Sequence, residues 1–85
     1  MHNKSTGKPL KLGMPATYRI HVQGYVDNSW RDWLWGMGIT KSSLPGQVPV
    51  TTLVGRLRDQ ASLMGVLNKL YELRLPILSV EYQEE

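Results

Sequence analysis

The stretch that decides the fold is Val50–Tyr82, which reads VTTLVGRLRDQASLMGVLNKLYELRLPILSVEY. Its first part, Val50–Leu57, is rich in β-branched residues and predicts a strand, in which Gly55 indicates a bulge or a close backbone approach. Apolar residues then recur at the helical period over Gln60–Leu73, after an N-cap at Asp59. A strand followed by a well-defined helix is therefore expected here.

The elements on either side of this pair complete a repeating order. Pro76 cannot continue the helix, so Ile77–Tyr82 is predicted as a strand. Upstream, Thr17–Val26 alternates in the manner of a half-buried strand. Asp27, Asn28 and Ser29 can each cap a helix start, and Ser29 with Asp32 suits a capping box, so a short helix that ends at Trp35 is expected. Met37–Lys41 is expected to form another strand. The resulting order is βαββαβ.

Two successive βαβ units with right-handed crossovers predict the α+β class and a ferredoxin-like sandwich. The expected sheet is four-stranded and antiparallel in the order 4-1-3-2, with both helices on one face. The other face would then be open to water or to a partner. On this open face the first strand is expected to present Arg19, His21, Gln23 and Tyr25.

Length and charge bound the domain organisation. Eighty-five residues suit one domain with a modest core. Residues 1–16 combine glycine, proline and three lysines and are predicted to form a disordered basic tail, with a single α+β domain over 17–85. Of the ten basic residues, three are Lys4, Lys8 and Lys11, so seven remain after residue 16, against all seven acids. The domain is therefore formally neutral, which argues against nucleic acid as a partner.

Composition also limits the compartment and the chemistry. The absence of cysteine excludes disulfides and thiolate metal sites and favours a reducing, cytoplasmic setting. No apolar run is long enough for a membrane helix, so no membrane association is expected. His21 is the only histidine after the tail and has no second ligand or triad partner in sight. No catalytic, metal-binding or cofactor-binding residue is predicted, and an enzyme is not expected.

Two segments carry a resemblance to known proteins. WRDWLWGMGIT and TTLVGRLRDQASLMGVLNKLYELRLPILSVE resemble a widespread set of short bacterial proteins of uncharacterised function, over Tyr18 to Glu81. The resemblance implies a shared fold and brings no established activity. Those relatives often have glycine in place of Arg74, where glycine would ease a left-handed helix end. The residues that carry the resemblance are Trp30, Asp32, Trp33, Gly55, Asp59, Gln60, Leu63 and the LPILSV run.

A second resemblance covers only one half of the domain. DQASLMGVLNKLYELRLPILSVE is similar to the helix and following strand of ACT regulatory domains, which bind small ligands such as amino acids between subunits. This resemblance implies that a small ligand is possible. The usual proline and glycine at the helix start are absent.

The three tryptophans complete the prediction of a contact surface. Trp30 and Trp33 share a helical stripe with Leu34 and are predicted to be core, whereas Trp35 is expected to point outward. The predicted function is a non-enzymatic protein-interaction or self-assembling module, a homo-oligomer or the partner of another protein. The alternatives are an ACT-like ligand-binding regulatory domain and a single-stranded nucleic-acid binder. The candidate interaction surface comprises Arg19, His21, Gln23, Tyr25 and Trp35.

Overall fold

The computed structural model describes residues 9–83 as a sheet with two helical segments. Lys4 and Lys8 of the predicted basic tail lie outside the described residues. The elements in chain order are β1 (Ala16–Gln23), the 3₁₀ helix η1 (Asn28–Leu34), β2 (Gly38–Ser42), β3 (Val50–Leu57), α1 (Gln60–Glu72) and β4 (Ile77–Gln83).

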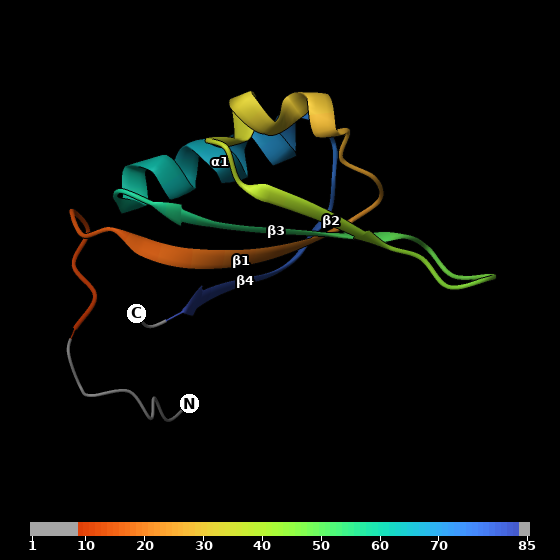
Figure 1. Ribbon diagram of the computed structural model, residues 1–85, viewed down its shortest axis with the longest axis horizontal. Coiled ribbons are helices and arrows are strands. Elements are labelled where there is room, and N and C mark those ends of the chain that lie inside the picture. The colour runs from red at the N-terminus through yellow and green to blue at the C-terminus, as the bar shows by residue number, and fades with distance from the viewer. Residues whose placement is uncertain (1–8, 84–85) are drawn as a thin grey trace.

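The sheet has four antiparallel strands in the order β2-β3-β1-β4. Read from the β4 edge, this is β4-β1-β3-β2, the order expected from the sequence. Figure 1 shows η1 and α1 together on one side of the sheet and β4 at the edge farthest from them. The α+β class and the four-stranded antiparallel sheet are thereby confirmed.

The helix-side face of the central strands forms the core. On β1, Tyr18, Ile20 and Val22 alternate with less buried residues, as the strand period requires. β3 adds Leu53 to the same face, opposite Ile20. The covering layer contributes the buried side chains Leu34, Leu63, Val66 and Leu70.

Gly55 lies on the helix-side face of β3, opposite Tyr18. The β1–β3 register is continuous there, so the glycine marks no bulge. A Cβ at this position would lie 2.9 Å from Cγ and 3.2 Å from Cα of Met37, which is itself buried. Of the two expectations for Gly55, the close backbone approach is the one realised.

The first helical segment departs from its prediction because it winds as a 3₁₀ helix. Its N-cap is Asp27, one of the three residues expected to cap it, which accepts a 2.9 Å hydrogen bond from the Ser29 amide. The expected capping box that starts at Ser29 is wrong. Leu34 is buried and Trp30 packs partly against the core. Trp33 is 57% exposed, with the Lys69 ammonium 5.3 Å from its ring centroid, so its placement in the core is also wrong.

α1 begins and ends with defined caps. The Asp59 carboxylate accepts 2.8 Å hydrogen bonds from the amide and hydroxyl of Ser62, which hold the pKa of Asp59 below its ordinary value. At the other end the Leu75 amide donates to the Leu70 carbonyl (3.2 Å), and the Arg74 amide donates to the Tyr71 carbonyl (2.9 Å). This is a Schellman ending with Arg74, at φ 63°, in the left-handed position usually taken by glycine.

The described part of the predicted tail contacts the domain. The Leu12 carbonyl accepts a 2.9 Å hydrogen bond from the Gln60 amide at the start of α1. Leu10 is partly buried against the core, and Ala16 is buried as the first residue of β1. The ordered contacts therefore begin several residues before Thr17, the predicted start of the domain.

Candidate interaction surfaces

The open face of the sheet carries a polar ladder between β1 and β4. Arg19 lies opposite Glu81, with 4.0 Å between Nη1 and Oε1, and His21 lies opposite Ser79, with a 2.8 Å hydrogen bond between Nδ1 and Oγ. With its amide oxygen turned toward Arg19, Gln83 accepts from that guanidinium at 3.0 Å. Two of the candidate residues are therefore engaged by neighbouring polar side chains.

This ladder offers little chemistry of its own. An exposed ion pair at 4.0 Å contributes about 0 to 1 kcal/mol. His21 has a serine hydroxyl as its partner rather than a carboxylate, and the described residues contain no cluster of three metal-ligating side chains. The arrangement resembles ordinary cross-strand pairing on a solvated face.

Tyr25 does not share this face. Gly24, at φ 104°, follows the last residue of β1 and interrupts the strand alternation. The Tyr25 ring lies 5.8 Å from the Lys41 ammonium, and Lys41 pairs with the fully buried Thr51 on the helix side of the sheet. The structure therefore places Tyr25 beyond the strand end, away from Arg19.

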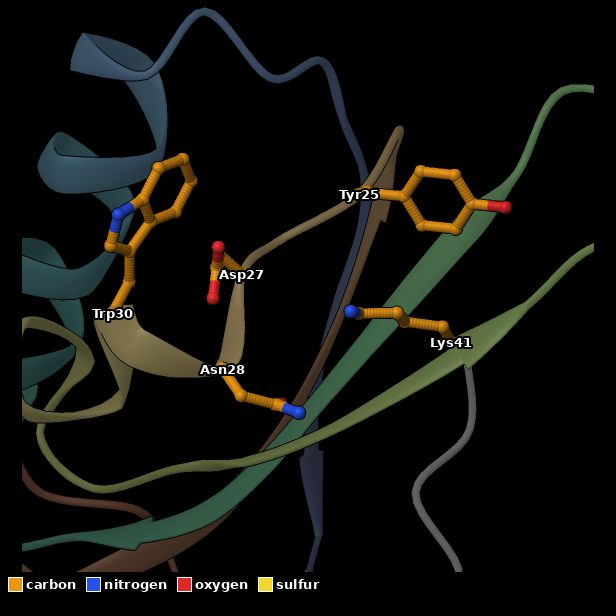
Figure 2. A pocket seen from close by; sticks show the side chains of 5 residues that line it. All are labelled: Tyr25, Asp27, Asn28, Trp30 and Lys41. Carbon is orange, nitrogen blue, oxygen red and sulfur yellow. The ribbon is translucent and has the colours of Figure 1, made fainter.

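Tyr25 instead lines an open hollow of about 430 Å³ beside the start of η1. Figure 2 shows Lys41 reaching from β2 between Tyr25 and Asn28, with Trp30 on the far side of Asp27. The hydrogen bond from the Ser29 amide lowers the pKa of Asp27. The carboxylate already caps η1 and the ammonium already faces an aromatic ring, so the two charged groups of the hollow, Asp27 and Lys41, are both engaged within the chain.

Trp35 lies in the helical layer, on the other side of the sheet from Arg19 and His21. Its backbone is left-handed, at φ 58°, and its ring packs on α1 at Gly65, where a Cβ would lie 2.5 Å from Cη2. The side chain remains 48% exposed. The five predicted residues thus fall on three separate surfaces: the open face with Arg19, His21 and Gln23, the hollow with Tyr25, and the helical layer with Trp35.

A different apolar surface emerges on β4. Ile77, Val80 and Tyr82 pair with Val22, Ile20 and Tyr18, so they share the helix-side face, and we call these three residues the β4 strip. Their exposed fractions are 39%, 41% and 37%, whereas each of their β1 partners is at most 2% exposed. The β4 strip is therefore core-type sequence that the helical layer covers only in part.

One flank of α1 borders the β4 strip. Gln60, Met64 and Tyr71 lie on one helical stripe, and the Gln60 amide group donates a 3.3 Å hydrogen bond to the Tyr18 hydroxyl. The Tyr18 ring lies 6.2 Å from that of Tyr82. Met64 and Tyr71 are both exposed, so this stripe of α1 also presents apolar side chains to solvent. Sequence periodicity carries no signal for this surface, because alternation looks the same on covered and uncovered strands.

The structure defines a small α+β domain with a polar open face and a helix-side face that is covered only in part. Within that class, the chain belongs to the family described as "Domain of unknown function (DUF8691)", whose model matches residues 17–81. No significant match was found among curated proteins or among solved structures. Among the described residues no helix is long and apolar enough to cross a membrane.

Proposed function

We propose that this chain is a non-enzymatic protein-interaction module whose contact surface is the β4 strip. The observation that carries the proposal is the contrast between Val80, which is exposed, and Ile20, its buried neighbour on the same face. Contiguous exposed apolar residues beside a core are typical of surfaces that bind other proteins. The absence of cysteine supports a reducing, cytoplasmic setting.

The energetics indicate what such a contact requires. Covering the three side chains of the β4 strip would contribute on the order of 5 kcal/mol at about 25 cal/mol per Å² of apolar area. Association costs about 4 to 15 kcal/mol in lost translational and rotational freedom. The strip alone therefore barely balances that cost. A stable contact needs further interactions along the same edge. No described strand pairs with the outer side of β4, so its backbone is available to make them.

The alternative functions have weaker support. A sheet that binds single-stranded nucleic acid presents aromatic side chains for base stacking. Here Tyr18 and Tyr82 lie on the helix side, and Arg19 on the open face is engaged by Glu81. The ferredoxin-like arrangement remains our proposal for the topology, since strand order and helix placement agree with it. An ACT-like ligand site would need an interface between subunits, so it depends on the same association.

Site-specific photocrosslinking tests the interaction module. We would replace Tyr82 by p-benzoylphenylalanine, which preserves the aromatic ring, and irradiate intact cells that produce the full chain. The matched variant carries the same group at Tyr25, an exposed tyrosine at the other candidate surface. We expect a discrete protein adduct from position 82, several-fold above that from position 25. Adducts from position 25 alone, or from neither position, would contradict the assignment to the β4 strip.

A further inference from the structure

We propose that the partner of the β4 strip is a second copy of this chain, which pairs its β4 edge antiparallel to the first about a two-fold axis at Val80. This inference rests on the proposed function and adds the identity of the partner and the geometry of the contact. The two four-stranded sheets would join into one continuous sheet of eight strands.

The backbone of β4 indicates which groups are available at the edge. The Gln23 amide donates to the Pro76 carbonyl (2.9 Å), so alternate residues of β1, including Arg19 and His21, direct their backbone groups toward β4. Their partners Glu81 and Ser79 are thereby paired inside the sheet. Val80 and Tyr82 then direct their amide and carbonyl groups outward, where a neighbouring strand can bind them.

Charge and strand length select the register. A two-fold axis places one residue opposite itself, and Val80 is the midpoint of the seven-residue strand Ile77–Gln83. In that register the Glu81 carboxylate lies opposite the Ser79 hydroxyl of the second copy, and a hydroxyl opposite a carboxylate is a favourable cross-strand pair. An axis at Glu81 would instead place the two carboxylates directly opposite each other. An axis at Ser79 would bring Pro76, which has no amide hydrogen, into the paired segment.

The opposite edge of the sheet is less suited to the same pairing. On β2 the helix-side row contains Lys41, which pairs with Thr51, and Ile39, which packs partly against the core. A charged side chain in the row of an edge strand disfavours pairing with another strand. The corresponding row of β4 is the β4 strip, which has no charge. Of the two edges, β4 therefore fits a second copy.

The same register joins the two β4 strips into one apolar surface. Val80 of each copy would lie against its counterpart. Tyr82 would lie across from Leu78 of the second copy, the residue that is skipped where the β1–β4 register shifts between Ser79 and Ile77. A standard interface buries about 800 Å² on each partner. The β4 strip is too small for that on its own, and the edge backbone and the exposed side chains of Leu78, Met64 and Tyr71 are available to enlarge it. The pairing thus supplies the additional interactions that the strip alone lacks.

Disulfide trapping tests the register, because the chain has no cysteine of its own. Ser79→Cys and Glu81→Cys would be purified separately as full chains, mixed, and oxidised by air at about 50 μM. In the proposed register these positions form directly opposing pairs with Cα atoms about 4.5 to 5.5 Å apart, within disulfide reach. We expect the mixture to form covalent dimer at least fivefold faster than either variant alone. Thr40→Cys on the exposed β2 edge is the control for random collision.

Light scattering of the wild-type chain after size exclusion gives an independent measurement. We expect twice the mass of one chain, and Val80→Lys is expected to weaken association at least tenfold because it brings two ammonium groups together. Thr40→Lys, an equal charge change on the β2 edge, is expected to have no effect. Dimers in which like positions cross-link faster than the mixture would overturn the register centred on Val80. A wild-type monomer at 50 μM would overturn the proposal that the partner is a second copy of this chain. If the benzoylphenylalanine at position 82 then cross-linked to a different protein, the proposed function as an interaction module would still stand.

Discussion

Leu53 and Val80 belong to one row of side chains that crosses the sheet, yet they have opposite surroundings. The row runs through Ile39, Leu53, Ile20 and Val80, all on the helix side. Leu53 and Ile20 are fully buried, whereas Val80 is exposed, although all four residues are aliphatic and β4 alternates like β1. The difference teaches that the covering layer, and not the strand pattern, decides which part of a sheet becomes core.

The dimensions of the two layers explain where the cover ends. Four strands at about 4.8 Å spacing are wider than one helix of about 10 Å diameter, so a single α-helix cannot cover them all. η1 is only seven residues long and contacts α1 and β2, so it extends the cover toward β2. No comparable element lies over β4 in the described part of the chain. The β4 strip therefore lies at the sheet edge opposite the one that η1 covers.

The largest expected effect comes from truncating the buried Leu53, compared with the same truncation at the exposed Val80. Leu53→Ala removes fully buried methyl groups and leaves a cavity beneath α1, so we expect a loss of about 2 to 5 kcal/mol in the free energy of unfolding. Val80→Ala truncates an exposed side chain in the same row, and we expect a change within about 0.5 kcal/mol in the isolated chain. Urea denaturation at low micromolar concentration measures both.

Equal losses from the Leu53 and Val80 variants would contradict the contrast between the covered and uncovered parts of the sheet. Repeating the Val80→Ala measurement at a tenfold higher protein concentration tests whether association buries Val80. If association buries Val80, the cost of the truncation is expected to increase with concentration, because binding stabilises the folded chain.

A smaller effect is expected where the covering layer touches the sheet backbone. In Gly55→Ala the new Cβ would lie 2.9 Å from Cγ and 3.2 Å from the backbone Cα of the buried Met37, so overpacking should cost about 1 to 3 kcal/mol. Gly13→Ala is the matched control, since nothing lies within 4 Å of a Cβ at that position. Thermal unfolding followed by far-ultraviolet circular dichroism compares the two. An unchanged melting temperature for Gly55→Ala would show that the approach of Met37 to β3 is looser than the structure indicates.

Much of the architecture follows from local signals in the sequence. The alternation in Thr17–Val26, the β-branched run in Val50–Leu57 and the apolar period after Asp59 each report a local preference that the fold retains. The order of elements then restricts the topology, because crossovers in one sheet share one hand. The N-cap at Asp59 was predictable for the same reason, since its partner Ser62 lies only three residues away.

The surface was harder to predict because it depends on contacts between distant elements. On an α-helical wheel Trp30, Trp33 and Leu34 share one stripe. In a 3₁₀ helix, with three residues per turn, Trp33 lies in line with Trp30 and Leu34 lies about 120° away, so burying Leu34 leaves Trp33 outside the core. Tyr25 leaves the open face because Gly24 interrupts the strand. The β4 strip was not predicted, since nothing in ILSVEYQ differs from a covered strand. Only the position of the helices reveals it.

The smallest expected change in the free energy of unfolding comes from the left-handed residues that end the two helices. Trp35 ends η1 and Arg74 follows α1, and both have left-handed backbones, a conformation that costs a non-glycine residue about 1 to 2 kcal/mol. Arg74 is exposed, so Arg74→Gly relieves that cost at the expense of about 0.4 to 1 kcal/mol of unfolded-chain entropy. We expect a net gain of about 0.5 kcal/mol in the free energy of unfolding, measured by urea denaturation.

Trp35→Gly is the matched comparison for Arg74→Gly, because it relieves the same backbone conformation but deletes a ring that packs on Gly65. Loss of the buried half of an indole should outweigh the backbone gain, so this variant is expected to be less stable than the wild type. Changes of opposite sign in the free energy of unfolding would show that two different interactions hold the two left-handed residues. Side-chain packing would hold Trp35, and backbone hydrogen bonds alone would hold Arg74. A loss of stability in both variants would instead mean that the Arg74 side chain contributes to the end of α1.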